Sequence, residues 1–330
     1  MKIRLSHKFE DIVGVDNLLL AWKEFLKGKK NKSDVQAFQF NLMDNILSLH
    51  DDLVNYTYHH GGYQCFKIND PKPRIIHKAG VRDRLLHHAV YRILYPFFDR
   101  TFISDSFSCR INKGTYKALS RFKRFSHIAS KNGTKICWVL KCDIRKFFAS
   151  IDQDILLNIL KEYISDEDII NILSGIIFSF HSTELGKGLP LGNLTSQLFA
   201  NVYMNEFDQF AKHKLKSKYY IRYADDFVIL SEDKNRLKED IPAIGSYLKN
   251  KLILTLHPNK VFIKTIYSGV DFLGWTNFLN YKTLRRVTKN RIFRNMEKDF
   301  KIETLSSYLG LLKHGNSNKV LNKVISLNNC

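Results

Sequence analysis

The stretch 218–230 constrains the fold more than any other part of the chain. Two runs of apolar, aromatic and β-branched residues flank the adjacent pair Asp225 and Asp226, a pattern that predicts a β-hairpin with the pair at its tip. Two neighbouring carboxylates between buried strands are costly unless a cation compensates them. Mg²⁺ would do so, because it prefers carboxylate oxygens; alternatively, both residues only stabilise the turn.

A second acidic strand end lies upstream, where the apolar run 138–143 ends at Asp143. An Asp at the end of one strand and an Asp pair on a neighbouring hairpin predict a cluster of three carboxylates. Such a cluster can hold two metal ions that promote in-line phosphoryl transfer.

The order of these motifs resembles the palm of a reverse transcriptase. Asp143 is followed five residues later by Phe148, and the hairpin tip reads Tyr-Ala-Asp-Asp. Between them, the segment 188–201 resembles the family's Gln-Gly-x-x-x-Ser-Pro stretch, but Leu191 replaces the usual Gln and Gln197 the usual Pro. Both departures are similar to the enzymes of diversity-generating retroelements, which copy a template RNA with errors at adenines. The resemblance covers roughly residues 70–315.

The resemblance implies an α+β fold, a right-hand polymerase with fingers, a palm made of an antiparallel sheet packed on helices, and a small helical thumb. The expected divisions are a helical N-terminal extension over 1–62, fingers over 63–135 and a palm over 136–276. The palm would contain an inserted fingers portion at about 153–195. Residues 277–330 would form a basic helical thumb.

The resemblance also assigns residues that bind the incoming nucleotide. Family members hold the triphosphate with fixed cations, here Lys72, Arg74 and Arg84, although each is alternatively a solvated surface charge. Phe148 would lie under the sugar and exclude a 2′-hydroxyl, and the palm lysine Lys260 would contact or protonate the pyrophosphate. The complete set of expected nucleotide-binding residues is Lys72, Arg74, Arg84, Phe148, Leu191, Gly192, Gln197 and Lys260.

By the same resemblance, the loop 188–192 would lie against the templating base and the nucleotide. Leu191 lacks the amide that would hydrogen-bond there, which predicts relaxed selection of the nascent pair, because discrimination depends on polar groups that a wrong substrate leaves unpaired. Alternatively, Leu191 only packs. Primer and template contacts are expected at Arg110, Lys113, Tyr223, Phe272, Leu273, Gly274, Trp275, Arg285 and Arg286.

The charge balance indicates a polyanionic partner. The chain carries 52 Lys and Arg against 32 Asp and Glu, a net charge of +20, which favours nucleic acid over a merely soluble basic surface. The region 281–330 is particularly basic, and Leu305, Leu309, Leu312 and Val320 follow a helical spacing, so a thumb could track an RNA–DNA hybrid through its phosphates. No apolar run is long enough for a transmembrane helix, no signal peptide is recognisable, and five scattered cysteines indicate no disulfide framework. A cytoplasmic protein without membrane contact is expected.

Local patterns predict the following further elements. Helices are expected over 15–22, 38–49, 81–94, 118–131, 153–164 with Asp152 as a cap, 166–180 with Ser165 as the N-cap, 196–210 and 235–249. Strands are expected on both sides of the turn 69–73 and over 252–257.

These observations predict an RNA-directed DNA polymerase that makes cDNA by two-metal nucleotidyl transfer, with Asp143, Asp225 and Asp226 as its catalytic residues and metal ligands. Two Mg²⁺ ions are expected as cofactors, with Mn²⁺ as a substitute. The resemblance implies error-prone copying at adenines for mutagenic retrohoming. The partners that it implies are dNTPs, a template RNA with its RNA–DNA hybrid, and a small basic accessory protein, either monomeric or oligomeric. Two alternatives are a retron or phage-defence reverse transcriptase and a non-catalytic RNA-binding protein.

Overall fold

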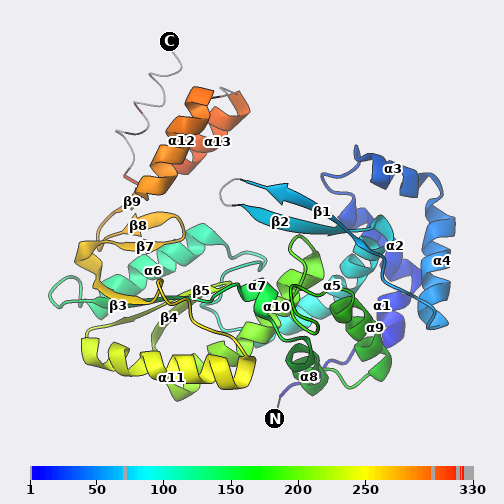
Figure 1. Cartoon of the computed structure of the whole chain (residues 1–330), viewed down its shortest axis with the longest axis horizontal. Coiled ribbons are helices and arrows are strands. Elements are labelled where there is room, and N and C mark those ends of the chain that lie inside the picture. Colours follow the sequence, from blue (N-terminus) through cyan, green and yellow to red (C-terminus); the bar gives the residue numbers. More distant parts are fainter. Residues whose placement is uncertain (1, 70–72, 299–301, 317–319, 321, 323–330) are drawn as a thin grey trace.

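The computed structural model describes residues 2–69, 73–298, 302–316, 320 and 322 (Figure 1). The described part has an α+β architecture with three antiparallel sheets, as expected. One end of the molecule consists of the N-terminal helices; the other carries the small sheet β7–β9 with helices α12 and α13 above it (Figure 1). The predicted triphosphate ligand Lys72 lies outside the described residues.

The central sheet has four antiparallel strands in the order β4-β5-β3-β6. Because side chains alternate across a strand, each of its strands can serve two cores. Leu140, Phe227 and Ile229 belong to the larger core, whereas their neighbours Val139 and Val228 belong to the second one. The bounds are β3 Trp138–Asp143, β4 Tyr219–Tyr223, β5 Asp226–Ser231 and β6 Phe262–Thr265.

Helices cover both faces of this sheet. Helices α10 (Leu194–Gln209, continued by the π-helical turn η1, Phe210–Lys214) and α11 (Lys234–Leu252) contribute to the larger core. Helix α6 (Thr115–Ala129) contributes Ala118, Leu119 and Phe122 to the second core. The predicted hairpin and the predicted helices at these places are therefore confirmed, with ends shifted by a few residues.

The N-terminal region is helical, as predicted, and packs on the long helix α5 (Val81–Thr101). The helix expected over 38–49 is interrupted, because Asn41 adopts φ −113° and ψ 48°, which is not helical. The bounds are α1 Phe9–Val13, α2 Val15–Phe25, α3 Ser33–Phe40 and α4 Leu42–Val54.

A separate hairpin and three helices complete the part of the chain around the aspartates. Strands β1 (Tyr63–Ile68) and β2 (Arg74–Ala79) pair antiparallel around the predicted turn. The helices are α7 (Phe147–Ser150), α8 (Gln153–Tyr163) and α9 (Glu167–Phe178).

The two helix caps expected in this region have different outcomes. The expected cap Asp152 is confirmed, since its carboxylate accepts a hydrogen bond from Ile155 N. Ser165 is not the N-cap of α9: the Asp166 carboxylate accepts the N–H groups of Asp168 and Ile169, and the Ser165 hydroxyl accepts a hydrogen bond from Arg4 instead.

The strand predicted over 252–257 is wrong. Helix α11 extends to Leu252 and ends at Ile253, whose φ of 50° is left-handed, and only a single bridge joins Leu256 to Ile144. The edge of β3 is already taken by β6. The segment serves the aspartates nonetheless, because His257 N donates a 2.7 Å hydrogen bond to the Asp143 carbonyl.

The C-terminal part consists of a small sheet followed by helices. Its strands are β7 Val270–Phe272, β8 Trp275–Asn277 and β9 Lys282–Leu284, preceded by the 3₁₀ turn η2 Ile266–Ser268, and its helices are α12 Arg286–Lys298 and α13 Ile302–Leu312. Of the four residues with the predicted helical spacing, Leu305 and Leu312 lie on α13 and contribute to the second core. Val320 also contributes but lies beyond α13, and Leu309 is not part of this core. Over the residues that the structure describes, every helix is too short or too polar to cross a membrane.

Candidate active site

The turn between β4 and β5 presents the Asp pair. Tyr223 pairs with Asp226 across the hairpin, which leaves Ala224 and Asp225 as the two residues of the turn. Ala224 adopts a left-handed φ of 55°, an uncommon conformation for a residue with a side chain. The carbonyl of Ala224 in the turn accepts a 3.2 Å hydrogen bond from Arg222 Nη1, which stabilises the turn.

The strand register brings the third carboxylate to the same place. Asp143, the last residue of β3, lies directly opposite Asp226 of β5. Side chains of directly opposed residues share one face of a sheet and have closely spaced Cβ atoms. The backbone reinforces this register, because Ile144 N donates a hydrogen bond to the Asp225 carbonyl. The predicted clustering of Asp143, Asp225 and Asp226 is therefore present in the structure.

Burial and mutual repulsion disfavour the charged forms of two of these carboxyl groups. Burial, with the Asp143 charge added, raises the pKa of Asp225 above its ordinary value, although Lys260 and Arg74 oppose the shift. Burial also raises the pKa of Asp226 to about 6, an effect that Lys141 opposes and Asp225 and Asp143 enhance. The positive charge near these carboxyl groups is therefore too small to offset their burial and mutual repulsion.

Two lysines compensate part of the charge. Lys141 Nζ lies 3.1 Å from Asp226 Oδ1, and Lys260 Nζ lies 3.0 Å from Asp143 Oδ1. Asp226 Oδ1 is buried and accepts no hydrogen bond of good geometry from the described residues. Within the same residues, no group of three Asp, Glu, His or Cys side chains is arranged so that it could hold a metal ion. The donor chemistry of three carboxylates nevertheless suits a hard divalent cation.

A fully buried ion pair stabilises the β4–β5 hairpin. The sequence analysis did not predict it. Arg222 and Asp208 side chains are both 0% exposed, and the guanidinium donates two hydrogen bonds of 2.7 Å to the carboxylate. Tyr220 Oη donates a further 2.6 Å bond to Asp208. The remaining N–H groups of Arg222 reach Asn201, Ser106 and the Ala224 carbonyl. An Arg inside an otherwise apolar strand was the only sequence signal for this network.

The motif loop before α10 is docked on the β1–β2 hairpin. His77 N donates to the Leu191 carbonyl, and Asn193 Nδ2 donates to the His77 carbonyl. Gly192 is required there, because its φ is 109° and a Cβ atom would approach Ile76 Cγ2 to 2.7 Å. The loop thus links the aspartate-bearing part of the molecule to β2.

The predicted nucleotide-binding residues divide into two groups. Arg74 and Lys260 lie close enough to Asp225 to influence its pKa. Phe148 is half-buried on α7, and its carbonyl accepts a hydrogen bond from Leu189 N at the start of the motif loop. Gln197 is half-buried in the first turn of α10.

Arg84 is placed differently. Its guanidinium bonds to Asp34 Oδ2 at 2.7 Å and lies over the Phe25 ring, and Lys78 shares the same carboxylate. These contacts favour a structural role between α3 and α5 over the expected triphosphate contact.

Arg110 is the second expected ligand whose charge is already used. Its side chain is 5% exposed, and the guanidinium binds the Asp99 carboxylate and three backbone carbonyls, those of Asp99, Ile103 and Ser106. Lys113 donates to the Ser104 carbonyl and lies over the Phe107 ring. The geometry thus leaves Arg110 unavailable for a template contact, and Lys113 would have to give up a backbone bond.

The predicted primer contacts centre on a tight turn between β7 and β8. Leu273 and Gly274 both have positive φ, of 51° and 84°, as a two-residue hairpin turn requires. Phe272 and Trp275 are buried beneath it, so the turn itself is what this hairpin can present to a ligand.

The other expected primer and template residues lie beside this turn or on the aspartate hairpin. Arg285 pairs with Asp271 at 3.2 Å, and Arg286 is exposed at the start of α12. The Tyr223 hydroxyl accepts a hydrogen bond from Thr115 at the start of α6.

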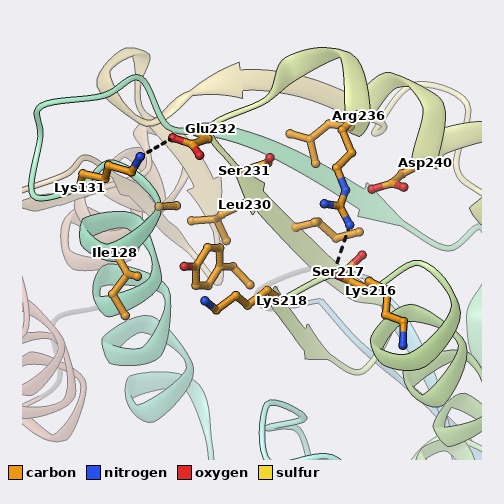
Figure 2. A pocket seen from close by; sticks show the side chains of 14 residues that line it. Ile128, Lys131, Lys216, Ser217, Lys218, Leu230, Ser231, Glu232, Arg236 and Asp240 are labelled. Carbon is orange, nitrogen blue, oxygen red and sulfur yellow. Dashed lines mark hydrogen bonds and ion pairs between the residues drawn. The ribbon is translucent and has the colours of Figure 1, made fainter.

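A pocket at the opposite end of the β4–β5 hairpin is distinct from the aspartates (Figure 2). Lys131 pairs with Glu232 on one side, and Arg236 bonds the Lys216 carbonyl on the other. Asp240 adds another acidic group. Because its charges are mixed and none of its lining residues belongs to the motifs described above, this pocket is not a candidate for the chemistry.

Comparisons with known proteins agree with the geometry. Residues 67–277 match the family described as "Reverse transcriptase (RNA-dependent DNA polymerase)". Protein YkfC of Escherichia coli (strain K12) is 24% identical over 83% of this chain and 77% of its own length. The group II intron-encoded protein LtrA of Lactococcus lactis subsp. cremoris is 23% identical over 63% of this chain. The putative COX1/OXI3 intron 2 protein of Saccharomyces cerevisiae is 21% identical over 65%.

The chain spans less than half of two of these relatives, 45% of LtrA and 30% of the yeast intron protein. Two solved telomerase structures share the fold. Telomerase from Candida albicans, solved with a fragment of telomeric RNA, has a TM-score of 0.52 and 12% identity over 81% of this chain and 55% of its own. Apo telomerase from Candida tropicalis has a TM-score of 0.51 and 14% identity over 74% of this chain and 60% of its own. The fold is therefore that of a right-hand polymerase, and the chain belongs to the reverse transcriptase family.

Proposed function

We propose that the chain is an RNA-directed DNA polymerase that extends a primer on an RNA template. The observation that carries this proposal is the register of β3 and β5, which sets Asp143 opposite Asp226 and beside Asp225. A protein that only bound RNA would gain nothing from three clustered carboxylates facing an anionic ligand.

Asp143, Asp225 and Asp226 would hold two Mg²⁺ ions, for which Mn²⁺ could substitute. When bound, these ions lower the pKa of the primer hydroxyl and neutralise charge on the triphosphate. Lys260 is partly exposed and bonds Asp143, so it can turn from the carboxylate towards the pyrophosphate. Lys141 is largely buried and would keep Asp226 in place.

The nucleotide would lie between the aspartates and the β1–β2 hairpin. Arg74, whose charge already acts on Asp225, would hold the triphosphate. Lys72 would do the same, and Phe148 would lie against the sugar and exclude ribonucleotides. Arg84 is the weakest member of the expected set, because it is bound to Asp34.

Error-prone copying at adenines is the finer part of the proposal. Leu191 uses its carbonyl to dock on β2 and offers no side-chain amide near the nascent pair. A site with fewer polar requirements rejects a wrong pair less strongly. This supports a role in mutagenic retrohoming, with a template RNA and a small basic accessory protein as partners.

The proposed functional divisions are an N-terminal helical extension over 1–62, fingers over 63–135, a palm over 136–276 with its inserted portion at about 153–195, and a thumb from 277. The exposed Arg286 at the start of α12 fits a thumb that contacts phosphates. Free cysteines at four described positions accord with work in the reducing cytoplasm.

The test is primer extension on an RNA template with Mg²⁺ and four dNTPs, followed by sequencing of the products. The wild-type chain should make DNA, with errors concentrated opposite adenine, and Asp225→Ala should make none. Asp44→Ala, which changes an exposed acid on α4, is the control. Accurate synthesis would favour a retron or defence enzyme. Absence of synthesis with native RNA and accessory protein present would leave only RNA binding.

A further inference from the structure

A second pocket lies between three segments that are far apart in the sequence. The first turns of α6, the strand β9 with the loop before it, and the end of α13 surround a cavity of 480 Å³. The residues that matter for its chemistry are Tyr116, Lys123, Phe278, Tyr281, Lys282 and His314. None of them belongs to the aspartate cluster or to the individual residues expected to bind nucleotide, primer or template, although Tyr281, Lys282 and His314 lie in the region expected to form the thumb.

Two stacked ring pairs form its aromatic walls. Tyr116 and His314 stack with ring centroids 3.7 Å apart and planes inclined by 28°, and Phe278 and Tyr281 stack at 4.5 Å with planes inclined by 16°. Tyr116 is 43% exposed and Tyr281 is 50% exposed. Both walls therefore present a flat aromatic surface to a ligand, which is the surface on which nucleic-acid bases stack.

The charge of the pocket is positive. Lys123 and Lys282 line it, and no carboxylate does so among the described residues. Burial, together with the neighbouring Lys123 charge, lowers the pKa of Lys282 below its ordinary value. Lys282 Nζ lies over the rings of Trp275 and Tyr116, at 5.0 and 6.0 Å from their centroids. Two ammonium groups facing the same cavity without an acid favour an anionic ligand.

The pocket is built into the fold. Asn316 N donates a 2.9 Å hydrogen bond to the Lys282 carbonyl, which fastens the end of α13 to β9. Gly315 lies against the Trp275 ring so closely that a Cβ atom would approach Cζ3 to 2.1 Å. Only glycine fits there, so the contact that closes the pocket depends on that residue.

We propose that this pocket binds one nucleotide, with the base on the aromatic walls and the phosphate between Lys123 and Lys282. The proposal rests on the proposed function only in that the protein handles nucleic acid. The nucleotide is either an unpaired residue of an RNA strand or a free mononucleotide. Helix α6 joins this pocket to the aspartates, because Thr115, next to Tyr116, bonds the Tyr223 hydroxyl.

The mixed-charge pocket of Figure 2 is a useful contrast. Its lysines and arginine are accompanied by Glu232 and Asp240, and it lacks a stacked pair of aromatic rings among its described lining residues. An anionic ligand would meet like charge there. The positive aromatic pocket beside α6 therefore makes the sharper proposal.

The test uses the full chain and a short single-stranded RNA that carries 4-thiouridine. Irradiation should crosslink the RNA to Tyr116 or Tyr281, as mapped by mass spectrometry. Substituting Lys123→Gln together with Lys282→Gln should weaken RNA binding about tenfold in fluorescence anisotropy and reduce its salt dependence. The double variant Lys238→Gln and Lys251→Gln removes two exposed charges from α11 and should have a much smaller effect.

Tyr281→Leu provides a second variant, since this half-exposed ring can be removed without opening the core. It should lower crosslinking and affinity by about five- to tenfold, the lower part of the range expected for one stacked base. Competition by adenosine monophosphate would identify a free nucleotide as the occupant, and failure to compete would identify a strand. Crosslinks elsewhere, or equal losses in pocket and α11 variants, would overturn the proposal.

The two proposals fail separately. DNA synthesis on a short, pre-annealed primer–template at saturating concentration reports on the aspartates. If no DNA is made but the RNA crosslinks to Tyr281, the pocket stands without the polymerase. If DNA is made and the pocket variants bind RNA like the wild type, the pocket proposal is wrong and the polymerase stands.

Discussion

The fully buried Asp208 of α10 bonds to the same hairpin that carries the partly buried pair Asp225 and Asp226, but the surroundings of these carboxylates differ. Asp208 receives two hydrogen bonds from Arg222 and one from Tyr220, all between 2.6 and 2.7 Å. Asp226 faces one lysine and two like charges, and Asp225 has no ion pair within the described residues. One carboxylate is compensated by the protein; the others are left short of positive charge.

This difference distinguishes the structural role of Asp208 from the proposed catalytic role of Asp225 and Asp226. A buried charge that is fully hydrogen-bonded fixes a structure, and its loss leaves its partner uncompensated. Carboxylates with raised pKa values in a shared site are instead prepared for a cation or a proton. Arg222 connects the two, because the same guanidinium binds Asp208 and the Ala224 carbonyl of the turn that presents Asp225.

The largest expected effect is on activity. Asp225→Asn should reduce primer extension by at least about 10³-fold, the scale expected when a group that stabilises developing charge is removed. Its melting temperature should stay the same or rise, because a repelled and buried charge is neutralised. Thermal unfolding of the metal-free protein and single-turnover extension measure both. A large drop in stability would show that Asp225 is structural.

Asp208→Asn should mainly reduce stability. Arg222 would lose its buried counter-charge, at a cost of about 3–5 kcal/mol in the free energy of unfolding. Tyr220→Phe removes only one hydrogen bond to the same carboxylate and should cost about 1–2 kcal/mol. Urea denaturation of both variants provides the comparison. If Asp208→Asn were as stable as the wild type, the contrast between the two acidic sites would be lost.

A bound metal ion should offset the excess negative charge at the turn that presents Asp225 and Asp226. Mg²⁺ at about a hundredfold excess over its Kd should stabilise the wild type by about 2.7 kcal/mol, but should have little effect on Asp225→Asn. The metal-free protein should also lose stability as pH rises towards and through about 6, since the folded-state pKa of Asp226 is raised to that value and its protonated form favours folding. Differential scanning fluorimetry across pH, with and without Mg²⁺, measures both trends.

Patterns that are local in sequence predicted most of the site. Alternating apolar residues predicted β3, β4 and β5, and their adjacent acids had to meet once those strands paired. The partners of charged residues could not be predicted in this way. Arg222 finds Asp208 on α10, and Arg84 finds Asp34 on α3. These pairings depend on the packing of helices against the sheet.

The sequence also did not predict which segment pairs with the free edge of β3. The apolar segment 252–257 has the composition of a strand, but β6 pairs with β3 instead. The pocket beside α6 was equally hidden, because it joins residues near 116, 281 and 314. Local patterns predict elements, whereas competition between elements decides which of them pair.

Lys260 should give the smallest effect and the finest test of the contrast. Its side chain is 42% exposed although it bonds Asp143 at 3.0 Å, so Lys260→Ala should change the free energy of unfolding by less than about 1 kcal/mol. If the lysine turns to the pyrophosphate during the reaction, kcat should fall about tenfold or more, up to the roughly 10²-fold that marks the lower end of the range for a positioned proton donor. Lys264→Ala, on the neighbouring strand β6, is the matched control. An unchanged kcat in Lys260→Ala would show that this lysine is only a counter-ion of Asp143. It would then resemble Arg222, which pairs with a carboxylate and takes no part in the reaction.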